Sequence, residues 1–388
     1  MLQYLAVFGA AAATAAGATP LVRKLALRFG AIDRPSDRKV HPKPTATLGG
    51  LALFLAFGVG LGVAYAIPSF RQDIFGASSE PLGALLAGAV VVALGAYDDV
   101  RDISVPTKVA GQVLAAGVMI LFGIQLLFFW FPGQGVLSLS SDLGVPLTIL
   151  WVLAMVNAVN LVDGLDGLAA GVVIIASVAF FSFSFVSERN LGDVPTTASM
   201  LSAIAAGAAV GFLPYNFHPA RIFMGDSGSM LLGSILAAAT ISGVGRTVTA
   251  PPESDLAALA IPVIIPALVL AVPFIDVLFA IGRRMRRRRP VTHADKEHIH
   301  HRLLEIGHTH RGAVLLIYFW SALLAGAALA ITFVNNRAGG IASLLIAVVI
   351  FLVTLLARLR RPNIPSPGGV GEVQEGARGG LTGRSRGR

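Results

Sequence analysis

Long apolar runs constrain this chain more than any other feature of its sequence. Eleven runs are candidates to cross about 30 Å of hydrocarbon as helices. They span residues 2–22, 48–67, 81–97, 109–129, 144–162, 168–187, 199–213, 229–243, 257–281, 313–332 and 340–357. Unbroken runs of this kind exceed the roughly ten-residue alternating strands of a membrane β-barrel. The sequence therefore predicts an all-α polytopic membrane protein with about eleven transmembrane helices.

The basic residues predict how these helices are oriented. With eleven spans the two termini lie on opposite sides of the membrane, and 26 of the 30 lysine and arginine residues then fall on one side. By the positive-inside rule this side is cytoplasmic, so the N-terminus is outside and the C-terminus is cytoplasmic. Basic loops beside a bilayer also explain the net charge of +9 without a nucleic-acid partner.

The domain organisation follows from the same pattern. Residues 1–357 are expected to form one integral membrane domain, and residues 358–388 a basic, Gly/Pro-rich tail that is disordered in the cytoplasm. The first positive charges follow the first apolar run, which predicts a membrane span and not a cleaved signal peptide. The absence of cysteine excludes disulfides and thiolate metal sites.

Polar side chains of unusual types gather in loops on the predicted cytoplasmic side. Five clusters lie there, at residues 33–43, 98–102, 157–166, 216–226 and 293–310. Cytoplasmic loops are generally polar, but this explains lysine and arginine better than paired carboxylates and amides. We therefore predict that the five loops share one site.

The carboxylates and amides indicate a hard cation. Asp98 and Asp99 are adjacent and repel each other, so they are best retained beside a cation, although a solvated helix end would also accommodate them. The run NAVNLVDGLDG is either a plain Asp-Gly turn or a set of oxygen donors that suit Mg²⁺. Its polar residues are Asn157, Asn160, Asp163 and Asp166.

Two further clusters offer groups for a nucleotide. Asp226 begins an apolar run, where free backbone N–H groups favour a phosphate, or where Asp226 is a plain N-cap. Phe223 and Tyr215 are candidate stacking surfaces for a base, or anchors at the membrane interface. The run HADKEHIHHRLLEIGHTHR holds six of the eight histidines, and its arginines favour a pyrophosphate cradle over a zinc site.

The strings DRKVHPKPTATLGG, DDVRD, NAVNLVDGLDG, FMGDSGS and HIHHRLL, in this order, resemble the polyprenyl-phosphate N-acetylhexosamine-1-phosphate transferase superfamily over residues 30–330. Ile299 interrupts the histidine string, which is similar to the WecA/TagO branch and differs from the related MraY branch. The resemblance implies transfer of N-acetylglucosamine-1-phosphate from UDP-GlcNAc to undecaprenyl or another polyprenyl phosphate, with release of UMP. This is the first membrane step of cell-wall or surface glycopolymer synthesis, on the cytoplasmic face of the cell membrane.

The resemblance also implies roles for individual residues. Asp98, Asp99 and Asp226 are the catalytic residues, and Asp226 with Asn160 binds Mg²⁺, for which Mn²⁺ can substitute. Because a phosphomonoester is mostly dianionic at neutral pH, positioning should matter more than a general base. The positions implied to bind substrate are Lys43, Asn157, Asp163, Asp166, Asn216, Phe223, His298, His300, His301 and Arg302. Among them, Asp166 and Phe223 match uracil contacts.

Two alternatives stay open from the sequence. One is an MraY-like transferase that takes UDP-MurNAc-pentapeptide, and the other is an ion-coupled membrane carrier. A carrier needs charged groups near the middle of the membrane, and only Asp276 in the run 257–281 fits that position. The expected partners are UDP-GlcNAc, the polyprenyl phosphate and the membrane itself, and a homodimer is compatible with the family.

Overall fold

The structure is a computed structural model of the 388-residue chain. It describes residues 1–35, 43–131, 135–190, 192, 194–244, 303–304, 307–333 and 337–359. The predicted span 257–281 with Asp276 lies outside these residues, and so do four of the predicted substrate-binding residues: His298, His300, His301 and Arg302.

Long helices dominate the described part of the chain. They are α1 (Leu2–Phe29), α2 (Gly50–Ala66), α4 (Glu80–Arg101), α5 (Val105–Leu121), α6 (Ser141–Val162), α7 (Leu168–Asn190), α8 (Thr197–Asn216), α9 (Gly225–Val244), α13 (His310–Phe333) and α14 (Arg337–Leu359). A short helix α3 (Pro68–Phe70) and a π-helix η1 (Arg71–Phe75) follow α2. Each long helix overlaps one of the predicted spans.

Six of these helices are long and apolar enough to cross a membrane, or seven if α2 and the segment Pro68–Phe75, bent by 90°, form one span. This confirms the all-α polytopic class. The count of eleven spans and the orientation of the termini stay predictions. Helix α14 ends at Leu359, two residues beyond the predicted boundary of the membrane domain, and the rest of the predicted tail lies outside the described residues.

One predicted span was wrong in its extent. The apolar run 109–129 was expected to be a single helix, but α5 ends at Leu121 and Gly123 has a left-handed backbone with φ +89°. Phe128–Phe131 instead forms strand β3, which pairs antiparallel with β4 (Gly135–Ser138). Hydrophobicity alone does not separate an apolar aromatic strand from a helix end, whereas aromatic residues favour strands.

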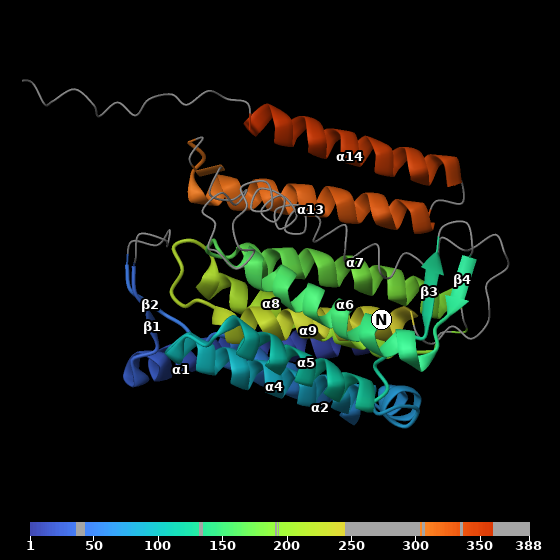
Figure 1. The fold of residues 1–388 in the computed structure, drawn as a ribbon, viewed down its shortest axis with the longest axis horizontal. Coiled ribbons are helices and arrows are strands. Elements are labelled where there is room, and N and C mark those ends of the chain that lie inside the picture. The colour runs from blue at the N-terminus through green and yellow to red at the C-terminus, as the bar shows by residue number, and fades with distance from the viewer. Residues whose placement is uncertain are drawn as a thin grey trace, which may run out of the picture.

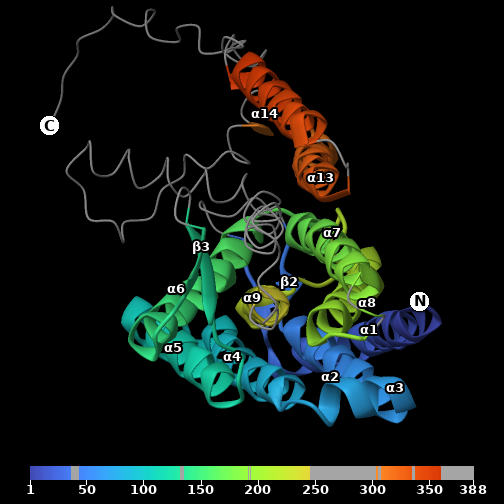
Figure 2. The same cartoon turned by 90° about the vertical axis from the view of Figure 1, so that its right-hand side faces the viewer.

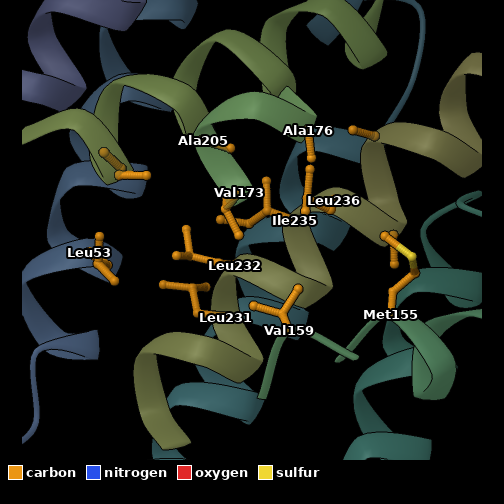
Figure 3. Close-up of a cluster of buried hydrophobic side chains, with 14 of the residues drawn as sticks. Leu53, Met155, Val159, Val173, Ala176, Ala205, Leu231, Leu232, Ile235 and Leu236 are labelled. Carbon is orange, nitrogen blue, oxygen red and sulfur yellow. The ribbon is translucent and has the colours of Figure 1, made fainter. Parts of the chain in front are cut away.

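Helix α9 occupies the centre of the bundle. Seen along the helix axes, α2, α4, α6, α7 and α8 surround it, and all five pack against it (Figure 2). Every residue from Ser227 to Ser242 is buried. Figure 3 shows apolar side chains that meet in this core: Leu231, Leu232, Ile235 and Leu236 of α9, with Leu53, Met155, Val159, Val173, Ala176 and Ala205 of the surrounding helices.

Two buried hydroxyl groups of α9, those of Ser234 and Thr240, form hydrogen bonds within the helix. Ser234 Oγ donates to Leu231 O at 2.8 Å, and Thr240 Oγ1 donates to Ala237 O at 2.9 Å. Because these hydroxyl groups have partners in their own helix, they can be buried without a large desolvation cost. Helix α13 packs outside this arrangement against α7, and α14 packs against α13 (Figure 1).

Glycine residues let α1 and α8 approach each other closely. Gly207 and Gly211 are four residues apart and face the backbone of α1, where Cβ atoms would collide with the carbonyl oxygens of Phe8 and Ala12. Small residues at this spacing are a common way to bring two membrane helices together. The contact fixes α1 against the core.

We expect Gly211→Ala to lower the thermal unfolding temperature of the detergent-purified protein by several degrees. The added methyl group has no space and should cost about 1–3 kcal/mol, as overpacking does elsewhere. Gly62→Ala in α2 is the matched control, because a Cβ at Gly62 has no neighbouring atom within 4 Å. Equal unfolding temperatures for the two variants would contradict the close α1–α8 contact.

The described residues of the polar clusters lie at one end of the bundle. Strands β1 (Ile32–Asp33) and β2 (Thr45–Ala46) pair there, and Ala46 bridges to Ile222 just before α9 begins. The β3–β4 hairpin lies at the opposite end (Figure 1). Hydrogen bonds connect residues from the loops after α1, α4, α6 and α8, as described below, so the predicted convergence of these loops is confirmed. Which side of a membrane this end faces stays a prediction.

Candidate active site

An acidic cluster forms where four helices end or begin. Asp98 lies in the last turn of α4, Lys108 in the first turns of α5, Asn160 in the last turn of α6 and Asp226 in the first turn of α9. Lys108 Nζ lies 3.0 Å from Asp98 Oδ2 and also forms an ion pair with Asp226. Asn160 Nδ2 donates to Asp226 Oδ1 at 2.8 Å. The structure therefore brings together three of the residues predicted from sequence, with a lysine between two of them.

Asp99 binds the N-terminus of α9. Its two carboxylate oxygens accept hydrogen bonds from the Asp226 N–H at 2.8 Å, the Ser227 N–H at 3.4 Å and Ser227 Oγ at 2.9 Å. A negative charge is favoured here by the helix dipole. Asp99 thus sets the direction of Asp226, and its predicted catalytic role stays a prediction.

This geometry corrects the interpretation of the FMGDSGS run. The sequence suggested either that Asp226 caps α9 or that its first N–H groups bind a phosphate. In the structure the cap comes from Asp99, 127 residues away, and it occupies the N–H groups of Asp226 and Ser227. The approach is possible because Gly225 has a left-handed φ of +68°, and because Gly95 presents no side chain to α9.

The cluster holds more carboxyl groups than cations among the described residues. Burial raises the pKa of Asp163, in the loop after α6, well above its usual range, and the charges of nearby Asp226, Asp99 and Asp166 raise it further. Within the described residues Lys108 is the cation that pairs with the cluster. Carboxylate and amide oxygens in excess over positive charge are a suitable donor set for a hard divalent cation.

A second group of side chains surrounds Asp166. Its Oδ2 accepts a hydrogen bond from His218 Nδ1 at 2.8 Å and from the Ala220 N–H at 3.0 Å. Its own N–H donates to His310 Nε2 at 3.0 Å. The imidazole rings of His218 and His310 stack with centroids 4.1 Å apart. Asp166 was a predicted substrate-binding residue. His218 and His310 lie in the predicted polar clusters 216–226 and 293–310, and His310 belongs to the run interpreted as a pyrophosphate cradle, but neither was among the individually predicted site residues.

Comparison with known proteins indicates the family of the chain. Residues 81–244 match glycosyl transferase family 4. The chain is 40% identical over 366 residues to a Mycobacterium tuberculosis protein named decaprenyl-phosphate N-acetylglucosaminephosphotransferase, covering 93% of this chain and 90% of that protein. A protein of the same name from Mycolicibacterium smegmatis is 41% identical over 367 residues, with the same coverage. The undecaprenyl-phosphate alpha-N-acetylglucosaminyl 1-phosphate transferase of Escherichia coli is 29% identical over 312 residues, covering 78% and 77%.

The chain belongs to the polyprenyl-phosphate N-acetylhexosamine-1-phosphate transferase family. The resemblance seen in the sequence motifs is thereby confirmed. The segment that matches glycosyl transferase family 4 runs from the start of α4 to the end of α9. It therefore contains the whole acidic cluster, whereas His310 lies beyond it.

Two residues expected to bind substrate in this transferase form hydrogen bonds with other segments of the protein. Asn216 is buried, accepts the Gly167 N–H at 3.2 Å and donates to Ile222 O at 3.1 Å, so it joins two loops. Asn157 Nδ2 donates to Gln112 Oε1 at 2.8 Å and so connects α6 to α5. Their contacts with a substrate stay predictions.

Two further predicted residues, Phe223 and Lys43, lie next to the short strand β2 and the start of α9. Phe223 is half-buried and its N–H donates to Ala46 O at 2.9 Å, which attaches the segment before α9 to β2. Lys43 is exposed, two residues before β2. Both positions are at the end of the bundle that carries the acidic cluster, and their contacts with a substrate stay predictions.

Sequence reasoning missed Lys108, although the sequence contains a signal for it. It was counted only as one of the basic residues that determine topology. In the transferase it lies in the first turn of the apolar helix α5, with its side chain only 19% exposed. A largely buried cation needs a partner, and the nearby Asp98 in the sequence was the available indication of one.

Proposed function

We propose that this chain transfers N-acetylglucosamine-1-phosphate from UDP-GlcNAc to a polyprenyl phosphate and releases UMP. The observation that carries the proposal is the acidic cluster, in which carboxylates from α4 and α9 converge on one cation inside the family segment. In the reaction an oxygen of the lipid phosphate bonds to the β-phosphorus of the donor. The bond from that phosphorus to the bridging oxygen breaks, and UMP leaves with the electron pair.

The proposed metal is Mg²⁺, for which Mn²⁺ can substitute. Asp98 and Asp226 would hold it, with Asn160 beside them, because Lys108 Nζ already marks the point at which the two carboxylates converge. When bound, the ion would neutralise charge on the diphosphate. The protein's own part is to fix these ligands: Asp99 orients Asp226 through the N-terminus of α9, and the Ile103 N–H holds Asp98 Oδ1 at 2.7 Å.

The proposed sugar and lipid rest on the relatives. The compared relatives are all named for transfer of N-acetylglucosamine, which supports this sugar over MurNAc-pentapeptide. The relatives at 40% and 41% identity are named for decaprenyl phosphate and the one at 29% for undecaprenyl phosphate. These identities favour decaprenyl phosphate over undecaprenyl phosphate as the polyprenyl phosphate expected from sequence. The basic loops support a location of the site on the cytoplasmic face.

A donor panel tests the proposal. Purified protein in detergent receives Mg²⁺, decaprenyl or undecaprenyl phosphate, and one of UDP-GlcNAc, UDP-GalNAc or UDP-MurNAc-pentapeptide, and the release of UMP is followed. We expect UMP from UDP-GlcNAc, loss of the activity with EDTA and its return with excess Mg²⁺. UMP only from the pentapeptide donor would place the chain with MraY. No UMP from any donor, in folded protein, would favour the membrane carrier.

A further inference from the structure

A polar contact between α5, α6 and α9 lies one helical turn further into the bundle than the acidic cluster. Its members come from the three helices that carry Lys108, Asn160 and Asp226. Residues three or four apart lie on the same face of a helix, so each member of the contact is stacked on a member of the cluster. The stacked pairs are Gln112 with Lys108, Asn157 with Asn160, and Met230 with Asp226.

The amide groups of Gln112 and Asn157 pair with each other. Asn157 Nδ2 donates to Gln112 Oε1 at 2.8 Å, and Gln112 Nε2 donates to Asn157 Oδ1 at 3.4 Å. Gln112 Nε2 also donates to Met230 Sδ at 3.5 Å, and Asn157 Nδ2 donates to Leu153 O at 2.8 Å. Each nitrogen and oxygen of the two amides therefore has a partner, and a polar group that is fully paired inside a protein favours one arrangement of the helices that form it.

Packing alone does not account for a glutamine at this position. Gln112 is fully buried, and it is the only polar side chain of α5 after Lys108. Burying an amide costs free energy unless its groups are hydrogen-bonded, whereas a leucine would fill a similar volume without that cost. What glutamine adds is a directional contact, because its donors and its acceptor must face their partners on α6 and α9.

We propose that Gln112 is a positioning residue, whose contacts set the spacing at which the cluster residues one turn away converge on one cation. This rests on the proposed function in one respect, namely that a divalent cation binds at Asp226. A helical turn is a short and stiff connection of about 5.4 Å, so a shift of α5 against α6 moves Lys108 against Asn160. Because Mg²⁺ demands near-ideal ligand geometry, such a shift weakens its binding.

The affinity for Mg²⁺ tests this inference without relying on activity. Gln112→Leu keeps the approximate volume of the side chain and removes all of its hydrogen bonds. Calorimetry on the full-length protein in detergent gives the Mg²⁺ affinity, and thermal unfolding in EDTA gives the stability. We expect Mg²⁺ binding to weaken by roughly tenfold, as it does when a group that orients a metal ligand is lost. The Mg²⁺ concentration for half-maximal UMP release should rise in proportion.

Thr240→Val is the matched control, because it removes a hydrogen bond between two of the same helices far from the cluster. Trp151 Nε1 of α6 donates to Thr240 Oγ1 of α9 at 2.8 Å, and Thr240 is more than three turns along α9 from Asp226. This variant should also unfold at a lower temperature than the wild type. Its Mg²⁺ affinity should stay within about twofold of wild type, since distant sites act independently.

Exchanging the two amides provides a rescue. In Gln112→Asn the side chain is one methylene group too short to reach its partner, so this variant should also bind Mg²⁺ more weakly. Adding Asn157→Gln restores the combined length of the pair and should recover most of the affinity. General damage to the fold would not be repaired by lengthening the partner. If Gln112→Leu fails to fold, the asparagine variant and the exchanged pair still decide.

The outcomes separate this inference from the proposed function. Wild-type Mg²⁺ affinity in Gln112→Leu would overturn the inference, and so would an equal loss of affinity in Thr240→Val. In either case transfer from UDP-GlcNAc by the wild type would leave the proposed function standing. Conversely, Mg²⁺ binding that depends on Gln112 and returns in the exchanged pair, without transfer from any donor, would support the inference and reject the proposed reaction.

Discussion

Asp226→Asn is expected to reduce the rate of transfer by about 10²–10³-fold while the protein stays folded, as losing one well-placed electrostatic group does in other enzymes. The substitution keeps the shape of the side chain and its hydrogen bond from Asn160, but it removes the negative charge that faces Lys108. The affinity for a divalent cation should fall with it. The measurement is UMP release over a series of Mg²⁺ concentrations, with thermal unfolding as the check on folding.

Asp142→Asn provides the matched control for this experiment. Asp142 undergoes the same chemical change, but it is exposed in the first turn of α6, at the other end of that helix from Asn160. Its activity should equal that of the wild type. Full activity in Asp226→Asn would show that this carboxylate does not hold the catalytic cation, and a loss shared by both variants would show a non-specific effect.

Lys108→Met is expected to give the largest loss of stability among single substitutions in the cluster. It leaves the carboxylates of Asp98 and Asp226, whose side chains are only 14% and 28% exposed, without their cation. Removing one partner of a largely buried ion pair costs several kcal/mol, and the residual exposure reduces this to about 1–3 kcal/mol. The unfolding temperature in EDTA should therefore fall by several degrees, because the two negative charges then repel each other.

Added Mg²⁺ distinguishes electrostatics from lost packing. A divalent cation that binds the folded state stabilises it by mass action. It should raise the unfolding temperature of Lys108→Met more than that of the wild type, since the variant has more uncompensated charge. The control is Lys24→Met, an exposed lysine near the end of α1, which should not change either temperature. A Lys108 variant as stable as the wild type in EDTA would contradict the ion-pair assignment.

The helices could be predicted because a membrane span has a single strong requirement, a long apolar run. The same criterion predicted the wrong helix end for residues 109–129, because the aromatic residues of β3 continue the apolar pattern past the end of α5. Asp98, Asn160 and Asp226 could be predicted to meet because each lies at a helix end on the same side. Topology alone brings such positions together, without knowledge of side-chain contacts.

Roles that depend on side-chain contacts between distant residues could not be predicted. Asp166 and His310 are 144 residues apart, and Asp166 and His218 are 52 apart, so no local pattern connects them. Asn157 was a natural substrate-binding candidate from its neighbours in the motif, but its partner Gln112 is on another helix. Such pairings follow from how the helices pack, which one sequence does not specify by periodicity.

The central position of α9 bears on how the protein is made. Helices α1 to α8 are synthesised before α9. The helices that surround α9 therefore cannot form their contacts with it until α9 has also been made (Figure 2). Asp226 lies in its first turn, so the site is completed when the bundle closes. A chain that stops before Gly225 lacks both the central helix α9 and Asp226. Such a truncated chain would expose the faces of α2, α4, α6, α7 and α8 that pack on α9 in the complete protein.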